Sequence, residues 1–192
     1  MRKVILAILS CIIVLVSCKE DNTTKESTES KKKVLPSAKI LNSVISKFQE
    51  CKQASAERLT CRNAFTKFIS ETYELEEFKN ANGEYKIYDS IQSIVIRNKS
   101  WEKLGVATNQ DNIDKAVTHA KKGALVLVID TSNTYGHVVA LQAGDTQKSG
   151  SWGLHLPQVF SLVNHKPEKS FQGKSLAYAF KKSDALEIYL RK

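Results

Sequence analysis

The sequence predicts an α+β domain in which helices come first and a small, mainly antiparallel sheet of about four to six strands follows. Apolar side chains recur at helical spacing from Ile40 to Cys51. A near-continuous aliphatic run over 124–130 is joined by a Ser/Thr/Asn-rich turn to a second apolar run over 138–141, as expected for two buried strands. Residues 185–190 alternate at the period of a strand and close the predicted sheet.

The N-terminus has the features of a targeting segment. Arg2 and Lys3 precede a thirteen-residue apolar run, Val4 to Val16, which is too short to span a bilayer and suits the core of a signal peptide. The run ends in Leu-Val-Ser-Cys18, which resembles a bacterial lipobox. This resemblance implies cleavage after residue 17 and acylation of Cys18 with palmitate-type chains, which anchor the protein to a membrane. An ordinary secretory signal with a chance cysteine is the alternative.

Residues 18–36 are predicted to be a lipidated, disordered tether. They are rich in Lys, Glu, Ser and Thr and nearly devoid of apolar side chains, so they cannot bury a core. Lys19 follows the cysteine where inner-membrane lipoproteins carry Asp, which resembles lipoproteins sent to the outer membrane, on either its periplasmic or its surface face. The chain is therefore expected to divide into a signal peptide (1–17), this tether (18–36) and one domain (37–192).

The charge of the chain argues against nucleic acid as a partner. The net charge of +9 falls to +7 when Arg2 and Lys3 leave with the signal peptide. No arginine-rich stripe interleaved with aromatic residues appears, and a modest positive charge suits anionic envelope polymers. His119 and His165 lack metal-ligand spacing to His137 or to a cysteine, and we expect no metal and no other cofactor.

A cysteine is predicted near the start of the second helix. Ser37 is the expected N-cap of the first helix and Thr60 that of the second, which places Cys61 on a first helical turn. Phe65 and Phe68 share its face and should pack on the sheet. The positive end of a helix dipole favours a thiolate, so Cys61 is a candidate nucleophile.

A histidine at the start of the second strand is the candidate base. Gly136 precedes His137 and leaves the backbone open to close approach by another chain. His137 is either a core histidine whose ring nitrogens are satisfied by neighbours or the base that serves Cys61. The second interpretation is the Cys-His arrangement of nucleophilic catalysis.

The motifs Cys61-Arg-Asn-Ala-Phe65 and Gly136-His137-Val-Val resemble the core of papain-like bacterial cell-wall amidases. These include the CHAP and NlpC-type cysteine peptidases and the amidase effectors of type VI secretion. The resemblance covers about residues 60–192 and implies a cysteine helix packed on a small sheet. It also implies hydrolysis of an amide bond in peptidoglycan stem peptides. The Cys61 thiolate would attack the carbonyl, His137 would carry the proton, and the backbone N–H of Cys61 would help to stabilise the oxyanion.

The same resemblance implies a third polar residue that orients the imidazole. His155 gives a Cys-His-His set, and Ser151 is the other candidate. An outward-facing strand residue is the alternative interpretation of His155. Trp152 and Gly136 are candidates for substrate binding, although tryptophans more often fill a core.

Other elements follow from periodicity and capping. They are a helix over 84–95, a helix capped by Asn109 or Asp111 that ends at Gly123, a strand over 153–160 in which Pro157 marks an edge, and a short apolar segment over 176–180.

A second cysteine in the domain opens an alternative. Cys51 and Cys61 lie ten positions apart in an exported chain, and oxidising compartments favour pairing. A Cys51–Cys61 disulfide would remove the nucleophile and favour a non-catalytic envelope lipoprotein that serves as a binding module. A reversible disulfide that switches activity is a third interpretation, and an immunity or inhibitor protein as partner is left open.

Overall fold

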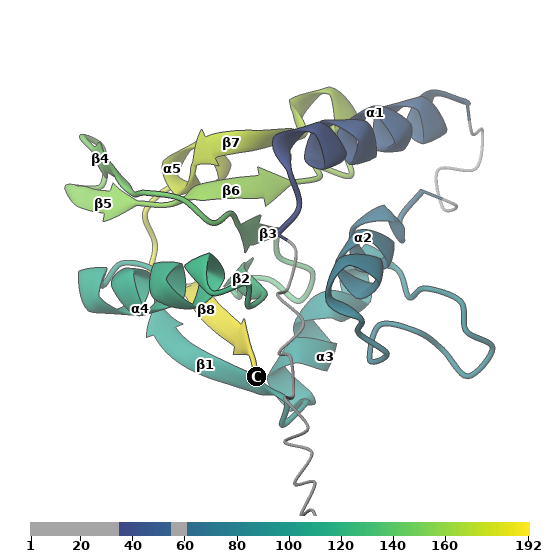
Figure 1. Ribbon diagram of the computed structural model, residues 1–192, viewed down its shortest axis with the longest axis horizontal. Coiled ribbons are helices and arrows are strands. Elements are labelled where there is room, and N and C mark those ends of the chain that lie inside the picture. Colours follow the sequence, from purple (N-terminus) through teal and green to yellow (C-terminus); the bar gives the residue numbers. More distant parts are fainter. Residues whose placement is uncertain (1–34, 55–60) are drawn as a thin grey trace, which may run out of the picture. The chain divides into compact units, whose positions relative to one another are not determined.

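The computed structural model describes residues 35–54 and 61–192 (Figure 1). The chain divides into two units at residue 31, and everything described here belongs to the second. The predicted signal peptide, the lipidation site at Cys18, nearly all of the tether and the expected cap Thr60 lie outside these residues.

Six strands of the described chain form one antiparallel sheet in the order β1-β8-β2-β3-β6-β7, and two more form a separate hairpin, β4-β5. The predicted α+β class and mainly antiparallel sheet are therefore confirmed. The strands are β1 Trp101–Val106, β2 Val126–Asp130, β3 Val138–Leu141, β4 Gln147–Ser149, β5 Leu154–Leu156, β6 Gln158–Ser161, β7 Phe171–Ser175 and β8 Leu186–Arg191.

Helices cover both faces of this sheet. The α-helices are α1 Ala38–Ala54, α2 Ala64–Tyr73, α3 Ile91–Arg97, α4 Gln110–Lys121 and α5 Leu176–Ala179, and the 3-10 turns are η1 Tyr88–Ser90 and η2 Pro167–Lys169. Helices α2 and α3 lie on the opposite side of the strands from α4 (Figure 1).

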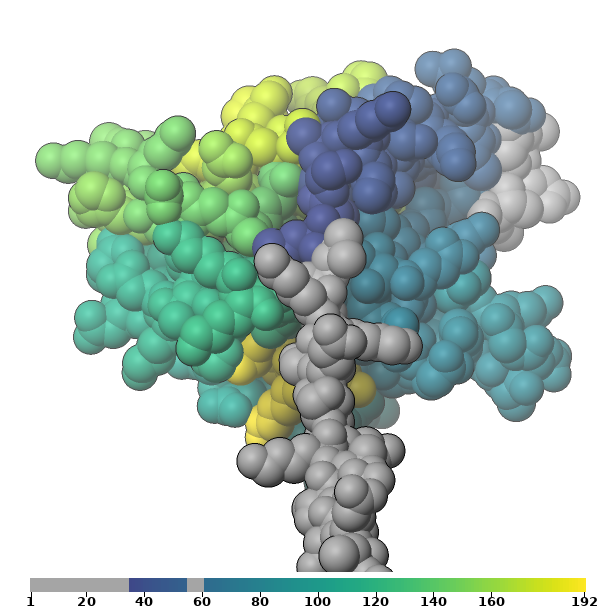
Figure 2. Space-filling model, viewed as in Figure 1, coloured from purple at the N-terminus to yellow at the C-terminus, as the bar shows by residue number. Residues whose placement is uncertain are grey.

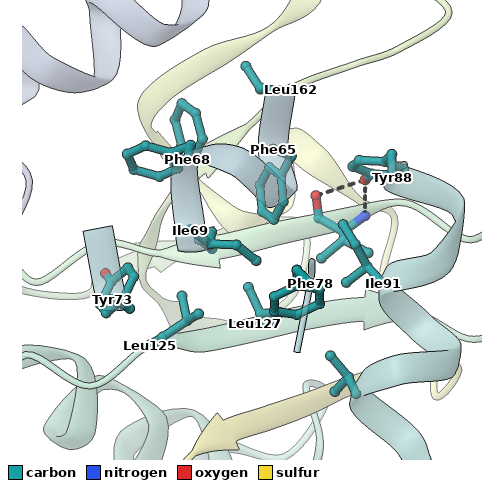
Figure 3. Close-up of a cluster of buried hydrophobic side chains, with 14 of the residues drawn as sticks. Phe65, Phe68, Ile69, Tyr73, Phe78, Tyr88, Ile91, Leu125, Leu127 and Leu162 are labelled. Carbon is teal, nitrogen blue, oxygen red and sulfur yellow. Dashed lines mark hydrogen bonds between the residues drawn. The ribbon is translucent and has the colours of Figure 1, made fainter. Parts of the chain in front are cut away.

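Strand β2 is buried on both faces, as its aliphatic run predicts. Leu127 and Ile129 belong to a core shared with α1, α2 and α3, of which Figure 3 shows a part. Val126 and Val128 belong to a second core shared with α4 and α5. Successive side chains of a strand point to opposite faces, so one strand contributes to both cores.

Helix α1 lies beside β7 and η2 at the far end of the sheet. The Gln49 amide donates a hydrogen bond to the carbonyl oxygen of Pro167 at 3.0 Å. In the space-filling view, the purple and blue atoms of α1 abut the yellow-green atoms of the last third of the chain (Figure 2). The first described helix is thereby held against elements more than a hundred residues later.

Several local predictions are confirmed. The hydroxyl of Ser37 accepts a hydrogen bond from the N–H of Ile40 at the start of α1. The side chain of Asn109 accepts one from the N–H of Asn112 at the start of α4. Gly123 follows the end of α4 with a φ of +87°, the left-handed conformation that glycine adopts at low cost.

Two helix predictions are wrong in their bounds. Helix α2 begins at Ala64, so Cys61 lies in the turn before it, where its carbonyl oxygen accepts from the N–H of Ala64 at 3.3 Å. The predicted helix over 84–95 is a loop, the turn η1 and then α3. The Asn80 side chain accepts from the N–H groups of Asn82 and Glu84 at 3.0 Å, and such local bonds compete with helix formation.

Two strand predictions are also corrected. Pro157 separates β5 from β6, and β6 lies between β3 and β7 rather than at an edge. Strand β8 lies between β1 and β2, so the last strand enters the interior of the sheet instead of closing it. The short apolar segment over 176–180 contains the helix α5.

Candidate functional site

His137 is held at the entry to β3 by the backbone of β2. The N–H of Asp130 donates to the carbonyl oxygen of His137 at 2.9 Å. A Cβ atom at Gly136 would lie 1.5 Å from the carbonyl oxygen of Asp130, so no side chain fits there. The expected close approach of another strand at this glycine is therefore present, and it fixes the position of the imidazole.

Both ring nitrogens of His137 contact hydroxyl groups. The Nδ1 atom lies 3.0 Å from the Tyr88 hydroxyl, and the Nε2 atom lies 2.8 Å from the Ser161 hydroxyl. The Tyr88 hydroxyl also donates to the carbonyl oxygen of Val138 at 3.0 Å and accepts from the N–H of the same residue. Figure 3 shows these two bonds to β3.

The hydroxyls of Tyr88 and Ser161 hold the imidazole of His137 in a fixed orientation. A tyrosine carries one hydroxyl proton, which can go either to the carbonyl oxygen of Val138 or to Nδ1 of His137. The tautomer of His137 follows from that choice. In either tautomer both ring nitrogens have a hydroxyl partner.

Burial keeps this group of residues neutral. The pKa of His137 is lowered from 6.5 to about 4, chiefly because its ring is removed from water. The nearby His165 lowers this pKa further, whereas the carboxylate of Asp130 opposes the change. Burial also raises the pKa of Tyr88 above its ordinary value of 10.0, so neither side chain is charged at neutral pH.

Cys61 forms a disulfide with Cys51, with their Cα atoms 5.9 Å apart. The bond joins the last turn of α1 to the turn that precedes α2. Both cysteines line a cavity of about 420 Å³ between these two helices, whereas His137 lines a separate cavity. In this oxidised form Cys61 carries no thiol, and the candidate nucleophile and base face different cavities.

The candidates for a third catalytic residue lie elsewhere. His155 is exposed on β5, where its N–H donates to the side chain of Gln110 at the start of α4. Ser151 is exposed next to Ser149, with the two hydroxyls 3.2 Å apart. Trp152 is buried in the core shared with α4, so its ring is not available to a substrate.

Sequence reasoning missed the two residues that hold the imidazole. Ser161 is completely buried in β6, and a serine inside an apolar strand is a signal that could have been read, because a buried hydroxyl requires a partner. Tyr88 gave no comparable signal, because 49 residues separate it from His137. The geometry thus corresponds to the alternative in which the ring nitrogens of His137 are satisfied by neighbours.

The cavity beside His137, which we call the His137 cavity, has a volume of about 630 Å³. Its lining includes Asp130 at the end of β2, His165 near η2, and Phe180 after α5. The ring of Phe180 lies 5.4 Å from that of His137, measured between centroids. Because His137 itself lines this cavity, a ligand bound there could approach the imidazole.

Over residues 35–54 and 61–192, no three His, Cys, Asp or Glu side chains are placed to hold a metal ion. Within the same ranges, no helix is long and apolar enough to cross a bilayer. In comparisons with known proteins, no family model matches this chain and no curated sequence is detectably similar to it.

Proposed function

We propose that residues 37–192 form a papain-like, NlpC-type module that binds a ligand at the cell envelope without cleaving it. One observation carries this proposal: both ring nitrogens of His137 are held by hydroxyls, those of Tyr88 and Ser161. In a Cys-His mechanism one ring nitrogen faces the thiol and the other faces an orienting group. Ser161 corresponds to the orienting group, and with Tyr88 at the other nitrogen neither ring nitrogen is left to face a thiol.

Neither hydroxyl is a credible replacement for the thiol. The raised pKa of Tyr88 disfavours a phenolate. Ser161 has no exposed surface, so a substrate carbonyl could not reach its oxygen. The site therefore has a histidine but no accessible nucleophile, which supports binding over hydrolysis.

The disulfide supports the same proposal. Exported domains commonly use such bonds as permanent cross-links, and only 2% of the surface of Cys61 is exposed. Alkylation followed by mass spectrometry of the native protein tests this directly. We expect Cys51 and Cys61 to resist alkylation until the protein is unfolded and reduced. A Cys61 that alkylates rapidly in the native protein would overturn the proposal.

A peptidoglycan amidase is the second candidate. It is favoured by Ser161, whose contact with Nε2 of His137 is the contact that orients a catalytic imidazole. In this alternative, reduction of the disulfide frees Cys61, whose thiolate attacks an amide carbonyl of a stem peptide while His137 transfers the proton. Reduced protein should then digest purified cell wall, and Cys61→Ser and His137→Ala should each abolish digestion. The absence of digestion by reduced, folded protein would exclude this alternative.

We further propose that the module is anchored through lipid at Cys18, at the outer membrane of a bacterial envelope. The lipobox-like sequence and the Lys19 that follows it support this location. The full-length protein should enter the detergent phase on phase separation, and the Cys18→Ala variant should remain in the aqueous phase. Equal partitioning of the two proteins would exclude the lipid anchor.

A further inference from the structure

Three lysines at the rim of the His137 cavity have no anionic partner. Lys166, Lys169 and Lys181 all line this cavity, and their side chains form no ion pair or hydrogen bond with any residue in the described ranges. Five other lysines each pair with a carboxylate: Lys67, Lys79, Lys103, Lys121 and Lys192. Other lysines of the described surface, among them Lys39, Lys115 and Lys148, also have no ion pair, but Lys166, Lys169 and Lys181 are brought together around one cavity.

The charge within the cavity is correspondingly positive. The three lysines face a single lining carboxylate, that of Asp130. One oxygen of this carboxylate already accepts a hydrogen bond from the N–H of Ser132 at 3.0 Å. Glu168 lines a neighbouring cavity rather than this one. The three lysines and Asp130 together carry a formal charge of +2, which favours an anionic occupant.

The type of cation favours phosphate over carboxylate. Arginine, whose planar fork matches a carboxylate, is absent from the lining, and all the permanent cations are lysines. Lysine binds phosphate as a compact point charge. A phosphate monoester carries roughly −1.5 to −2 charges near neutral pH, so two or three ammonium groups can balance it.

Aromatic rings also line the cavity. Phe171 and Phe180 are buried there, whereas Tyr178 is 60% exposed. The rings of Phe171 and Tyr178 pack edge to face with their centroids 4.8 Å apart. Such a surface suits the carbon portion of a ligand whose charged end lies among the lysines.

We propose that the His137 cavity binds a phosphate monoester with an apolar carbon portion, held by Lys166, Lys169 and Lys181. This inference rests on the proposal that the cavity binds a ligand without cleaving it. The same chemistry is found in the headgroup of an anionic lipid and in a soluble phosphate ester.

Isothermal titration of the full-length mature protein in a neutral detergent tests this inference, with titration into detergent alone subtracted. The probes are hexyl phosphate, glycerol 3-phosphate and succinate. We expect hexyl phosphate to bind and succinate to bind at least tenfold more weakly. Affinity for hexyl phosphate at least about tenfold above that for glycerol 3-phosphate indicates a lipid-like ligand, and a smaller difference indicates a soluble ester.

A matched pair of variants distinguishes binding in the His137 cavity from non-specific attraction of the phosphate to a positively charged surface. The variant Lys166→Ala/Lys169→Ala/Lys181→Ala should bind hexyl phosphate about tenfold more weakly or worse, since each exposed ion pair is worth a few-fold. The control removes three exposed lysines elsewhere, Lys39, Lys115 and Lys148. It loses the same net charge and should retain the wild-type affinity.

Three results would overturn the inference: no binding of hexyl phosphate, succinate binding as tightly as hexyl phosphate, or equal losses in the two triple variants. The outcome is separable from that of the proposed function. A rapidly alkylating Cys61 in a protein that still binds hexyl phosphate would refute the non-catalytic assignment alone. An intact disulfide without phosphate binding would refute this inference alone.

Discussion

Acidification should destabilise the fold through His137. The pKa of this residue is lowered from 6.5 to about 4 by burial, so between these values the unfolded chain binds a proton that the folded chain does not. Stability depends on pH through this difference in bound protons, and it is therefore lost as the pH falls through 6.5 toward 4. Each pKa unit corresponds to about 1.4 kcal/mol, so lowering the pH from 7 to 5 should cost about 2 kcal/mol.

Urea unfolding of the full-length protein at pH 7 and pH 5 measures this loss. The variant His137→Asn should lack most of the pH-dependent loss, because asparagine has no group that titrates in this range. His155→Asn is the matched control, since His155 is exposed on β5, and it should lose as much stability as the wild type.

Other shifted groups act outside this pH window. Burial alone would raise the pKa of Glu77 and of Glu187. The contact with Arg191 outweighs burial and lowers the pKa of Glu77 below its ordinary value of 4.5, and the contact with Lys103 lowers that of Glu187 in the same way. Stability from such carboxylates is present above their unfolded pKa and is lost only at lower pH. If His137→Asn loses as much stability as the wild type between pH 7 and pH 5, the assignment of His137 as a buried neutral imidazole is wrong.

Three further variants, each measured by urea unfolding at pH 7, test the contacts that hold His137 and the Cys51–Cys61 disulfide. Tyr88→Phe removes a hydroxyl bonded to two backbone groups and should destabilise the protein by about 2–4 kcal/mol; a loss below about 1 kcal/mol would refute these bonds. Gly136→Ala should cost about 3 kcal/mol through its clash with β2, whereas Gly144→Ala, with nothing within 4 Å, should be nearly neutral. The double variant Cys51→Ser/Cys61→Ser opens a disulfide that spans ten positions and should cost about 3 kcal/mol; unchanged stability would contradict a structural role.

The parts of the fold that were predictable from sequence depend on neighbouring residues. The β2–β3 hairpin follows from two apolar runs, a polar turn and Gly136, all within twenty residues. The cap at Asn109 and the glycine at the end of α4 are equally local signals. Strand β1 is not predicted from the sequence, because it is held in the sheet by pairing with β8, which lies more than eighty residues later in the chain.

The candidate site likewise has a part that is encoded by neighbouring residues and a part that depends on long-range pairing. His137 and the glycine before it were recognisable, because the strand and the turn that position them are encoded locally. The partners of the imidazole depend on the sheet register: pairing of Ala140 with Phe160 brings Ser161 alongside the start of β3. The spacing of Cys51 and Cys61 and the oxidising compartment of an exported chain predict the disulfide as an alternative. The contact of Tyr88 with His137, which argues against catalysis, has no local sequence signal.

The disulfide and the imidazole are linked through a short series of bonds. Arg62 follows Cys61 in the chain. Its backbone carbonyl oxygen accepts a hydrogen bond from the N–H of Tyr88 at 2.8 Å, and its guanidinium forms an ion pair with Asp89. Tyr88 in turn holds His137. Reduction of the disulfide alone would therefore leave the Tyr88 hydroxyl in contact with the imidazole. Catalysis requires two changes, reduction and displacement of Tyr88 from Nδ1 and from the backbone of β3, whereas binding in the His137 cavity requires neither. This difference is the physical reason for ranking the binding module above the amidase.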